Sequence, residues 1–181
     1  MKKFKLTSEF IVDISGVKLF RIKALIEFGN VKAGDLGGYI EKEENLSHMG
    51  NAWVSGNAQV SGDARVSGDA RVSGNAWVSG NAQVSGDARV SGNARVSGDA
   101  QVFGDARVSG DKDYAYAHGF GSCNRTTTFF RLKDGDVGVR CGCFYGTLAQ
   151  FRDNVCETHG ETKKAQEYLM LADLMDFRFK N

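Results

Sequence analysis

A six-residue period runs through the middle of the chain from Gly50 to Asp111, and it constrains the fold more than any other feature. Each unit reads Gly, Asn or Asp, Ala, one variable residue, Val and Ser. Gly50–Ser55 is the first unit and Gly104–Ser109 is the last full one, and Phe103 interrupts the Ser position once. A unit this short holds only one strand and one corner, so stacked units must share a core.

The alternation within a unit indicates which side chains face the core. Residues two apart on a strand share a face, so Ala52 and Val54 point inward while Trp53 and Ser55 point outward. Gly followed by Asn or Asp supplies the corner, because these residues tolerate left-handed backbone angles. The pattern resembles the hexapeptide repeats of left-handed parallel β-helices, which implies closure after three units. A flattened two-sided coil stays compatible with the spacing alone.

Closure after three units would stack residues 18 apart into columns on the outer surface. One column would hold Trp53, Arg71, Arg89 and Arg107, and the corner column beside it would hold Asn51, Asp69, Asp87 and Asp105. Stacked arginines repel one another unless something neutralises them. Either the aspartates do so in a solvated ladder of ion pairs, or the arginines form a surface for an anion or an acidic partner.

The variable positions carry a second, longer period. They run Trp, Gln, Arg, Arg and then begin again, so the sequence also repeats every 24 residues. This order indicates duplication of a four-unit block. Duplication would copy the outward side chains together, so it argues against separate selection of each one for a function.

Composition bounds the class of protein. A chain of 181 residues fits one or two small domains, and a net charge of +1 makes nucleic acid an unlikely partner. The basic start has no apolar run behind it, since Asp13 interrupts the only candidate, so we expect no signal peptide and no membrane span. Four cysteines clustered late in the chain fit a reducing cytoplasm.

Three sections follow from these patterns. Residues 1–49 are expected to form N-terminal strands and a solenoid cap, residues 50–111 the hexapeptide solenoid, and residues 112–181 a C-terminal α+β unit. In the first section, Phe10–Ile14 and Val17–Ile22 read as a hairpin, and Asp35–Ser47 reads as an irregular coil that caps the open sheet edges.

The C-terminal section reads as alternating strands and helices. The expected elements are strands at Thr126–Leu132 and Val137–Phe144, a helix opened by a capping box at Thr147–Gln150 and ended by Gly160, a helix at Lys163–Met175, and a last short strand at Phe177–Phe179. A unit this small would be only marginally stable if it folded alone. We therefore expect a homo-oligomer, a dimer or trimer, to cover aromatic residues such as Phe129, Phe130, Phe144, Tyr145 and Phe151.

Both ends of the chain resemble a family of phage and prophage hexapeptide-repeat proteins. The residues that carry the resemblance are Arg21–Leu25, Gly34–Glu41, Gly119–Ser122, Arg125–Arg131, Cys141–Phe144, Gly146–Leu148 and Thr158–Gly160. Members are often described as polymer-forming cytoskeletal proteins or as transferases. The resemblance implies a mobile element in a bacterial host cell and brings no catalytic residue with it.

Enzyme signatures are weak. Acyltransferases share the prism and use a histidine near a cleft, but the repeat holds no histidine: His48 precedes it, and His118 and His159 follow it. The same separation argues against a three-histidine metal site. Four cysteines with His159 could be drawn as zinc ligands, yet no Cys pair has two-residue spacing, so small core residues are the better interpretation. We expect no catalytic residue, no metal and no cofactor.

One segment after the repeat could hold an anion. Backbone N–H groups at Gly119, Gly121 and Ser122 could approach a phosphate, with charge from Arg125 and hydroxyls from Thr126 and Thr128. The alternative is a turn that leads into a Thr-rich strand.

Together these features predict a mainly β protein, a left-handed parallel β-helix with a small C-terminal α+β unit. The expected function is a non-catalytic, phage-type scaffold that binds a host protein or a small anionic ligand, such as a nucleotide, in a role such as counter-defence. The alternative is a hexapeptide-repeat acyltransferase.

Overall fold

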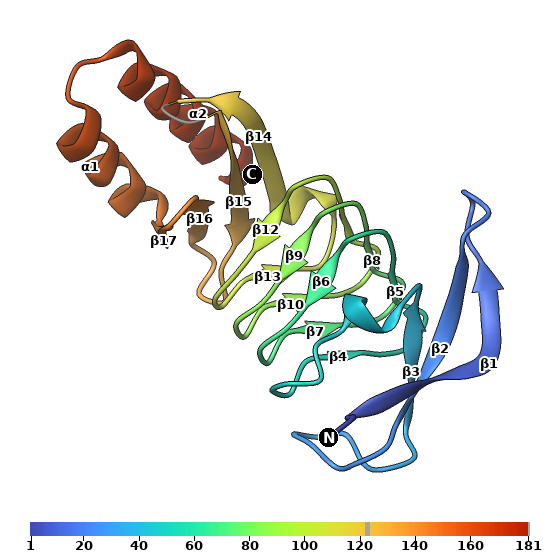
Figure 1. The fold of residues 1–181 in the computed structure, drawn as a ribbon. Coiled ribbons are helices and arrows are strands. Elements are labelled where there is room, and N and C mark those ends of the chain that lie inside the picture. Colours follow the sequence, from blue (N-terminus) through green and yellow to red (C-terminus); the bar gives the residue numbers. More distant parts are fainter. Residues whose placement is uncertain (122–123, 181) are drawn as a thin grey trace.

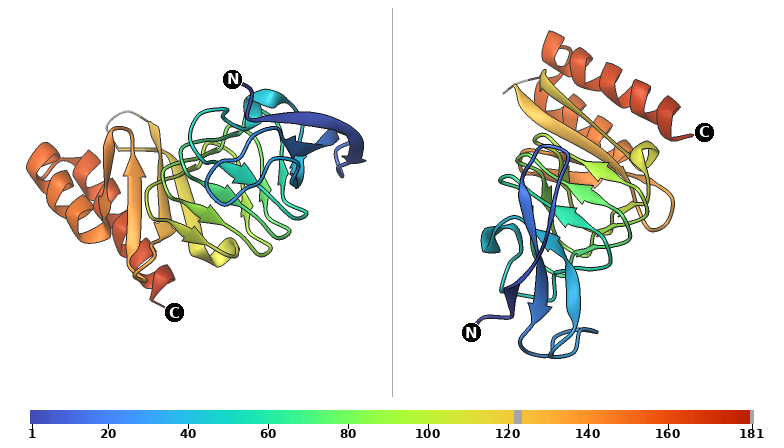
Figure 2. Two further views of the ribbon diagram at one scale, coloured as in Figure 1. Left: turned by 90° about the horizontal axis from the view of Figure 1, so that it is seen from below. Right: turned by 90° about the vertical axis from the view of Figure 1, so that its right-hand side faces the viewer.

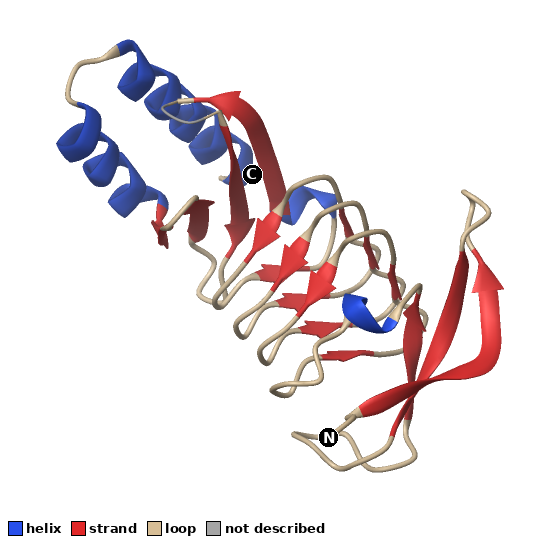
Figure 3. Ribbon diagram, viewed as in Figure 1, coloured by secondary structure: helices blue, strands red, loops and turns tan. Residues whose placement is uncertain are grey.

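The computed structural model describes residues 1–121 and 124–180 of the chain. A β-solenoid forms the middle of the molecule, a long hairpin projects from its N-terminal end, and a sheet with two helices covers its C-terminal end (Figures 1 and 2). Figure 3 shows strands in the hairpin, the solenoid and the C-terminal part, whereas the long helices belong to the C-terminal part. The expectation of a mainly β solenoid with a C-terminal α+β unit is confirmed.

Every solenoid strand consists of a variable residue and the Val that follows it. The strands are β4 (Trp53–Val54), β5 (Gln59–Val60), β6 (Arg65–Val66), β7 (Arg71–Val72), β8 (Trp77–Val78), β9 (Gln83–Val84), β10 (Arg89–Val90), β11 (Arg95–Val96), β12 (Gln101–Val102) and β13 (Arg107–Val108). Each pairs in parallel with the third strand along, as β4–β7–β10–β13, β5–β8–β11 and β6–β9–β12. The register joins Trp53 to Arg71, 18 residues on, so the coil is three-sided and the two-sided alternative is excluded.

The inward columns form a narrow apolar core. The Ala and Val side chains from Ala52 to Val108 are at most 1% exposed. The corners need glycine because successive coils approach closely there: Gly68 has φ +66°, and a Cβ on it would lie 3.0 Å from the amide nitrogen of Gly86. Small core residues and glycine corners thus leave no room inside for a ligand.

Hydrogen bonding gives the solenoid two chemically different ends. The bonds that flank each short strand run from an N–H of one coil to a C=O of the next, as from Ser55 to Val72 (2.9 Å) and from Asn57 to Gly74 (2.9 Å). At these flanking positions carbonyl groups therefore face the N-terminal end, and N–H groups face the C-terminal end. Buried groups of either kind need partners, so the two ends require opposite caps.

Side-chain donors cap the N-terminal end. The Lys3 ammonium donates to the carbonyls of Ala52 (2.8 Å) and Gly50 (3.3 Å), and the Asn45 amide donates to those of Ala64 (2.9 Å) and Gly62 (3.0 Å). Both side chains are buried. Burial lowers the pKa of Lys3 to about 8, and the charge of Asp69 opposes that shift.

Side-chain acceptors cap the C-terminal end. The amide of Arg95 donates to Asp111 Oδ1 and that of Gln101 donates to Thr128 Oγ1, both at 2.9 Å. Asp111 begins the short 3-10 helix η2 (Asp111–Asp113). The caps thus match the chemistry of each end.

The N-terminal strands extend one side of the solenoid. They are β1 (Phe4–Val12), β2 (Lys18–Ala24) and β3 (Leu36–Ile40), followed by the 3-10 helix η1 (Glu43–Asn45). The hairpin is confirmed, although β1 begins six residues earlier than Phe10. Because β3 pairs in parallel with β5, and Leu46 bridges to Val66, the Asp35–Ser47 segment is itself an irregular first coil.

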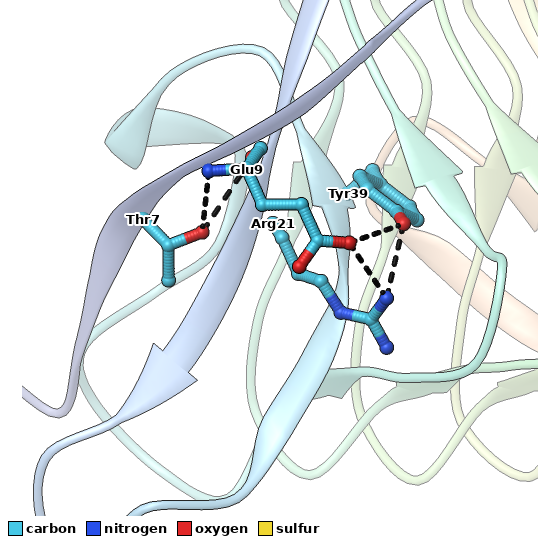
Figure 4. Close-up of polar contacts among 4 residues, drawn as sticks. All are labelled: Thr7, Glu9, Arg21 and Tyr39. Carbon is cyan, nitrogen blue, oxygen red and sulfur yellow. Dashed lines mark hydrogen bonds and ion pairs between the residues drawn. The ribbon is translucent and has the colours of Figure 1, made fainter.

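A polar network holds the hairpin on this first coil (Figure 4). Arg21 donates to Glu9 Oε1 and to the Tyr39 hydroxyl, both at 3.0 Å, and that hydroxyl donates to Glu9 (3.1 Å). Thr7 closes the bulge of β1 by accepting from the Glu9 amide (3.2 Å). The hydrogen bond to Glu9 raises the pKa of Arg21. The network joins β1, β2 and β3, so its role is structural, and within the described residues it leaves only Arg21 Nε buried without a hydrogen-bond partner.

The C-terminal part is an antiparallel sheet backed by two helices. The elements are β14 (Tyr114–Phe120), β15 (Arg125–Arg131), β16 (Val137–Cys141), β17 (Phe144–Thr147), α1 (Leu148–His159) and α2 (Lys163–Phe179). Strand β15 is the joint: Thr128 and Phe130 face the solenoid, and Phe130 enters its core, whereas Phe129 lies in the separate core beneath the helices.

Three expectations for this part are wrong. Phe177–Phe179 is helical, because no Gly or Pro interrupts α2 and Phe179 continues its buried face. Val137–Phe144 is two strands separated by a turn at Gly142, whose φ is +58°. Phe129, Phe130 and Phe151 do not await a partner, because they are buried within the chain. The capping box and the end of α1 at Gly160 are confirmed.

Candidate functional site

The arginine column (Arg71, Arg89 and Arg107) lies on the side of the solenoid formed by β4, β7, β10 and β13. Parallel register places Arg71 beside Arg89 and Arg89 beside Arg107. Neighbouring strands lie about 4.8 Å apart, so three cationic side chains leave successive rungs of one sheet. Trp53 precedes them in register and is buried against Phe28, with ring centroids 5.4 Å apart.

The aspartate column beside it does not form the expected ladder of ion pairs. In the described residues, no ion pair with an N···O distance of 4.0 Å or less joins the two columns. Arg107 donates instead to the carbonyls of Asp87 (3.0 Å), Asp105 (3.2 Å) and Ala106 (2.8 Å). Asp69 accepts from the amide and side chain of Asn51.

Arg71 and Arg89 therefore stand apart from Arg107. Within the described part of the chain, neither of their side chains makes a hydrogen bond or an ion pair. Arg89 is exposed and Arg71 is half-buried. Two like charges on adjacent rungs, with no carboxylate of the described residues within 4.0 Å of either, favour binding of an anion between them.

Grooves flank the column on both sides. One groove of about 360 Å³ is lined by Trp53, Ser55, Arg71, Ser73, Arg89 and Ser91. The other, of about 330 Å³, is lined by the aspartate column, the arginines, Gly29 and Lys133. The first of these, here called the serine groove, adds hydroxyl donors beside the cations. Its serines also stand 18 residues apart, so the spacing that predicts the arginine column predicts a serine column beside it.

The hydrogen-bond donors expected at an anion site in the Gly119–Thr128 segment do not converge in the described residues. The amide of Gly121 donates to Glu167 Oε2 (2.9 Å), a carboxylate that stands where an anion would have to bind. A Cβ on Gly121 would overlap the ring of Tyr168 in α2, whereas Gly119 (φ +86°) has open space around it. Ser122 lies outside the described residues.

The hydroxyls and the arginine of this segment have separate partners. Thr126 Oγ1 lies 2.9 Å from His118 Nδ1, and Thr128 Oγ1 accepts from the Gln101 amide on the solenoid. The Arg125 guanidinium packs over Gly142. Thr128 and Gly121 thus serve as contacts with the solenoid and with α2.

The histidines are spread over the molecule. His48 Nδ1 accepts from the Lys3 amide (3.2 Å), so Nε2 carries the proton in the neutral ring and no acceptor nitrogen is left for a general base. Its ring stacks on Phe4 at 4.3 Å and lines an open cavity of about 600 Å³ over η1 and β6. His159 stacks on Tyr168 at 5.8 Å. No pair of histidines shares a site in the described residues.

The expectation that the cysteines are small core residues is wrong for those that the structure describes. Cys141 Sγ accepts from Thr127 (3.2 Å), and Cys143 and Cys156 are exposed thiols. Cys123 lies outside the described residues. Within residues 1–121 and 124–180, no group of three or more His, Cys, Asp or Glu side chains is placed to hold a metal ion. No helix in these ranges is long and apolar enough to span a membrane.

Comparison with protein-family models identifies the repeat. The model of the YdcK beta solenoid repeat matches residues 58–70, 64–80, 70–86 and 82–98. No curated protein matches the chain. The hairpin, the arginine at the end of the column and the C-terminal part lie outside the matched region, so the similarity concerns the coils: the chain carries a β-solenoid repeat like that of YdcK.

Proposed function

We propose that the protein is a non-catalytic binding scaffold whose arginine column binds an acidic partner protein. The observation that carries the proposal is the pair Arg71 and Arg89, which lie on adjacent rungs of one sheet without a hydrogen bond or ion pair in the described residues. A carboxylate between them would accept charge-assisted hydrogen bonds from both guanidinium groups.

The surroundings support a binding surface rather than a catalytic centre. The serine groove supplies neutral donors along the column, and the coil places identical groups at a regular spacing of about 4.8 Å. An extended acidic segment of a partner could follow that repeat. The aspartate column along the other edge would repel it and so fix its position.

A charge-removal experiment tests the proposal. The variant Arg71→Gln/Arg89→Gln/Arg107→Gln should lose binding to a fluorescent polyglutamate peptide, and wild-type binding should weaken steeply with salt. The control, Arg65→Gln/Arg95→Gln, removes charge from the other two sides of the coil and should bind normally. The free energy of unfolding should change by no more than about 0.5 kcal/mol for Arg71→Gln or Arg89→Gln, because neither side chain has a hydrogen bond or ion pair to lose in the described residues.

Other results would redirect or refute the proposal. Binding that survives the triple change, or that ignores salt, would refute the arginine column as the site. Binding of free nucleotides that Arg125→Ala abolishes would place a small anionic ligand at the Gly119–Thr128 segment instead. Turnover of an acyl donor would identify the protein as an acyltransferase.

We also propose the setting that the family resemblance implies: a left-handed hexapeptide-repeat protein of phage type that acts in the cytoplasm of a bacterial host, with a host protein as its partner and counter-defence as its role. The free thiols of Cys143 and Cys156 are compatible with a reducing compartment. Capture from infected cells with wild-type and triple-variant baits tests this setting. A host protein retained only by the wild type is expected, and equal retention by both baits would contradict it.

A further inference from the structure

Helix α2 carries apolar side chains on two opposite faces. Its inner face is buried in the C-terminal core through Ala165, Tyr168, Ala172, Met175 and Phe179. On its outer face Met170, Leu174 and Phe177 are 70%, 56% and 71% exposed. Spacings of four and three residues place them on one line along the helix, here called the apolar stripe.

The neighbouring helix shows that this stripe is unusual for the unit. Helix α1 buries Leu148, Phe151 and Val155 on its inner face in the same way. Its exposed positions include Gln150, Asp153, Asn154 and Glu157, which are polar. A helix that is apolar on both faces is typical of one with a partner on each side.

We propose that a second copy of the chain covers the apolar stripe, with the two α2 helices packed antiparallel about a twofold axis. Met170 and Phe177 lie at equal distances, about 5 Å along the helix, on either side of the midpoint between Asp173 and Leu174. Antiparallel packing about that midpoint sets Met170 against Phe177 of the partner subunit, and sets Leu174 against its own equivalent. The stripe is therefore complementary to itself, as a twofold contact requires.

The charges that flank the stripe favour the antiparallel arrangement. Glu167, which accepts from the Gly121 amide (2.9 Å), and Arg178, which donates to the Asp111 carbonyl (3.2 Å), lie on the same edge of the stripe and toward opposite ends of α2. The twofold therefore brings these opposite charges of the two copies toward each other, twice, while each keeps its partner within its own chain. A parallel pair would instead place Lys163 and Lys164 beside the same residues of the other copy and align the two helix dipoles. Asp173, near the axis, is already paired with Arg152.

The size of the stripe also fits a dimer contact. Three side chains of this exposure offer on the order of 400 Å² of apolar surface, about half of what one partner contributes to a standard interface. The dimer carries two arginine columns, so it can bind a repetitive or paired acidic partner with increased avidity.

Sedimentation of the full chain at micromolar concentration tests the proposal. We expect a dimer for the wild type, a monomer for Leu174→Glu, and a dimer for the control Asn154→Glu, which places the same charge on the exposed face of α1. Circular dichroism and thermal melting check that both variants fold. A monomeric or trimeric wild type, or a folded Leu174→Glu that stays dimeric, would overturn the proposal.

Disulfide trapping tests the orientation independently. In a Cys143→Ser/Cys156→Ser background, a mixture of Met170→Cys and Phe177→Cys proteins should cross-link mainly as the mixed pair when oxidised. Preferential 170–170 and 177–177 cross-links would show parallel helices. Random cross-linking at the rate of the background protein would show that the stripe is not an interface between copies.

Discussion

Replacement of Thr128 by Val should loosen the joint between the solenoid and the C-terminal sheet. Thr128 is fully buried, and its hydroxyl accepts the hydrogen bond of the Gln101 amide at 2.9 Å. Valine has the same shape, so no cavity forms and the change isolates the loss of the acceptor. An amide left without a partner at a buried site costs about 1–3 kcal/mol. For a chain of this size that cost lowers Tm by roughly 2–10 °C.

The matched control is Thr126→Val on the same face of the strand. The Thr126 hydroxyl contacts only the exposed His118 in the described residues, so its loss should change stability by less than about 0.5 kcal/mol. Denaturant unfolding measures both variants. Hydrogen exchange localises the effect. The amide of Gln101 should exchange faster in Thr128→Val, while that of Gln83, bonded to Ala100 of the next coil, stays protected. Equal stability of the two variants would refute the capping argument.

Other perturbations test the N-terminal cap and the corners. Burial lowers the pKa of Lys3 from 10.5 to about 8, so the charged form of Lys3 disfavours folding. The free energy of unfolding of the wild type, relative to that of Lys3→Met, should therefore rise as the pH increases from about 8 to 10.5. Denaturant titration at each pH measures this difference. Asn45→Asp replaces a donor to two carbonyls by an acceptor, so it should destabilise more than Asn45→Leu at neutral pH in the same assay. Gly68→Ala should lower Tm by several degrees because φ is +66° and the next coil is in contact, whereas Gly110→Ala, with no atom within 4 Å, should leave Tm unchanged.

The sequence was a sufficient guide wherever the repeat governs the structure. Alternation of Ala and Val predicted the inward columns, whereas the 18-residue register followed from closure after three units, which only the resemblance to hexapeptide repeats implied. Local signals also predicted α1, because the capping box at Thr147 and the glycine at 160 act within a few residues of the helix ends.

Features that depend on contacts between distant segments were not predictable. The ends of the solenoid are capped by Lys3, Asn45 and Thr128, and nothing near these residues in sequence shows that their partners are carbonyls or amides of a coil. Strand β14 was missed because its glycine-containing sequence gains stability only by pairing with β15. The candidate anion site likewise depended on spacing along the chain, whereas packing directs Gly121 toward α2 and Thr128 toward the coil.

Closure of the coil after 18 residues couples the length of the solenoid to the relative orientation of its two ends. Insertion of 18 residues would shift the C-terminal sheet by one coil, about 4.8 Å, and keep its azimuth relative to the hairpin. The duplicated block in the sequence is 24 residues, or one coil and one side, so each duplication would also turn that sheet by about 120° around the solenoid axis. Only three such duplications, equal to four coils, restore the original phase. The number of repeat units therefore sets the azimuth of the apolar stripe relative to the hairpin. Adding one unit changes that azimuth by about 120°, although each coil keeps the same kind of inward Ala and Val contacts.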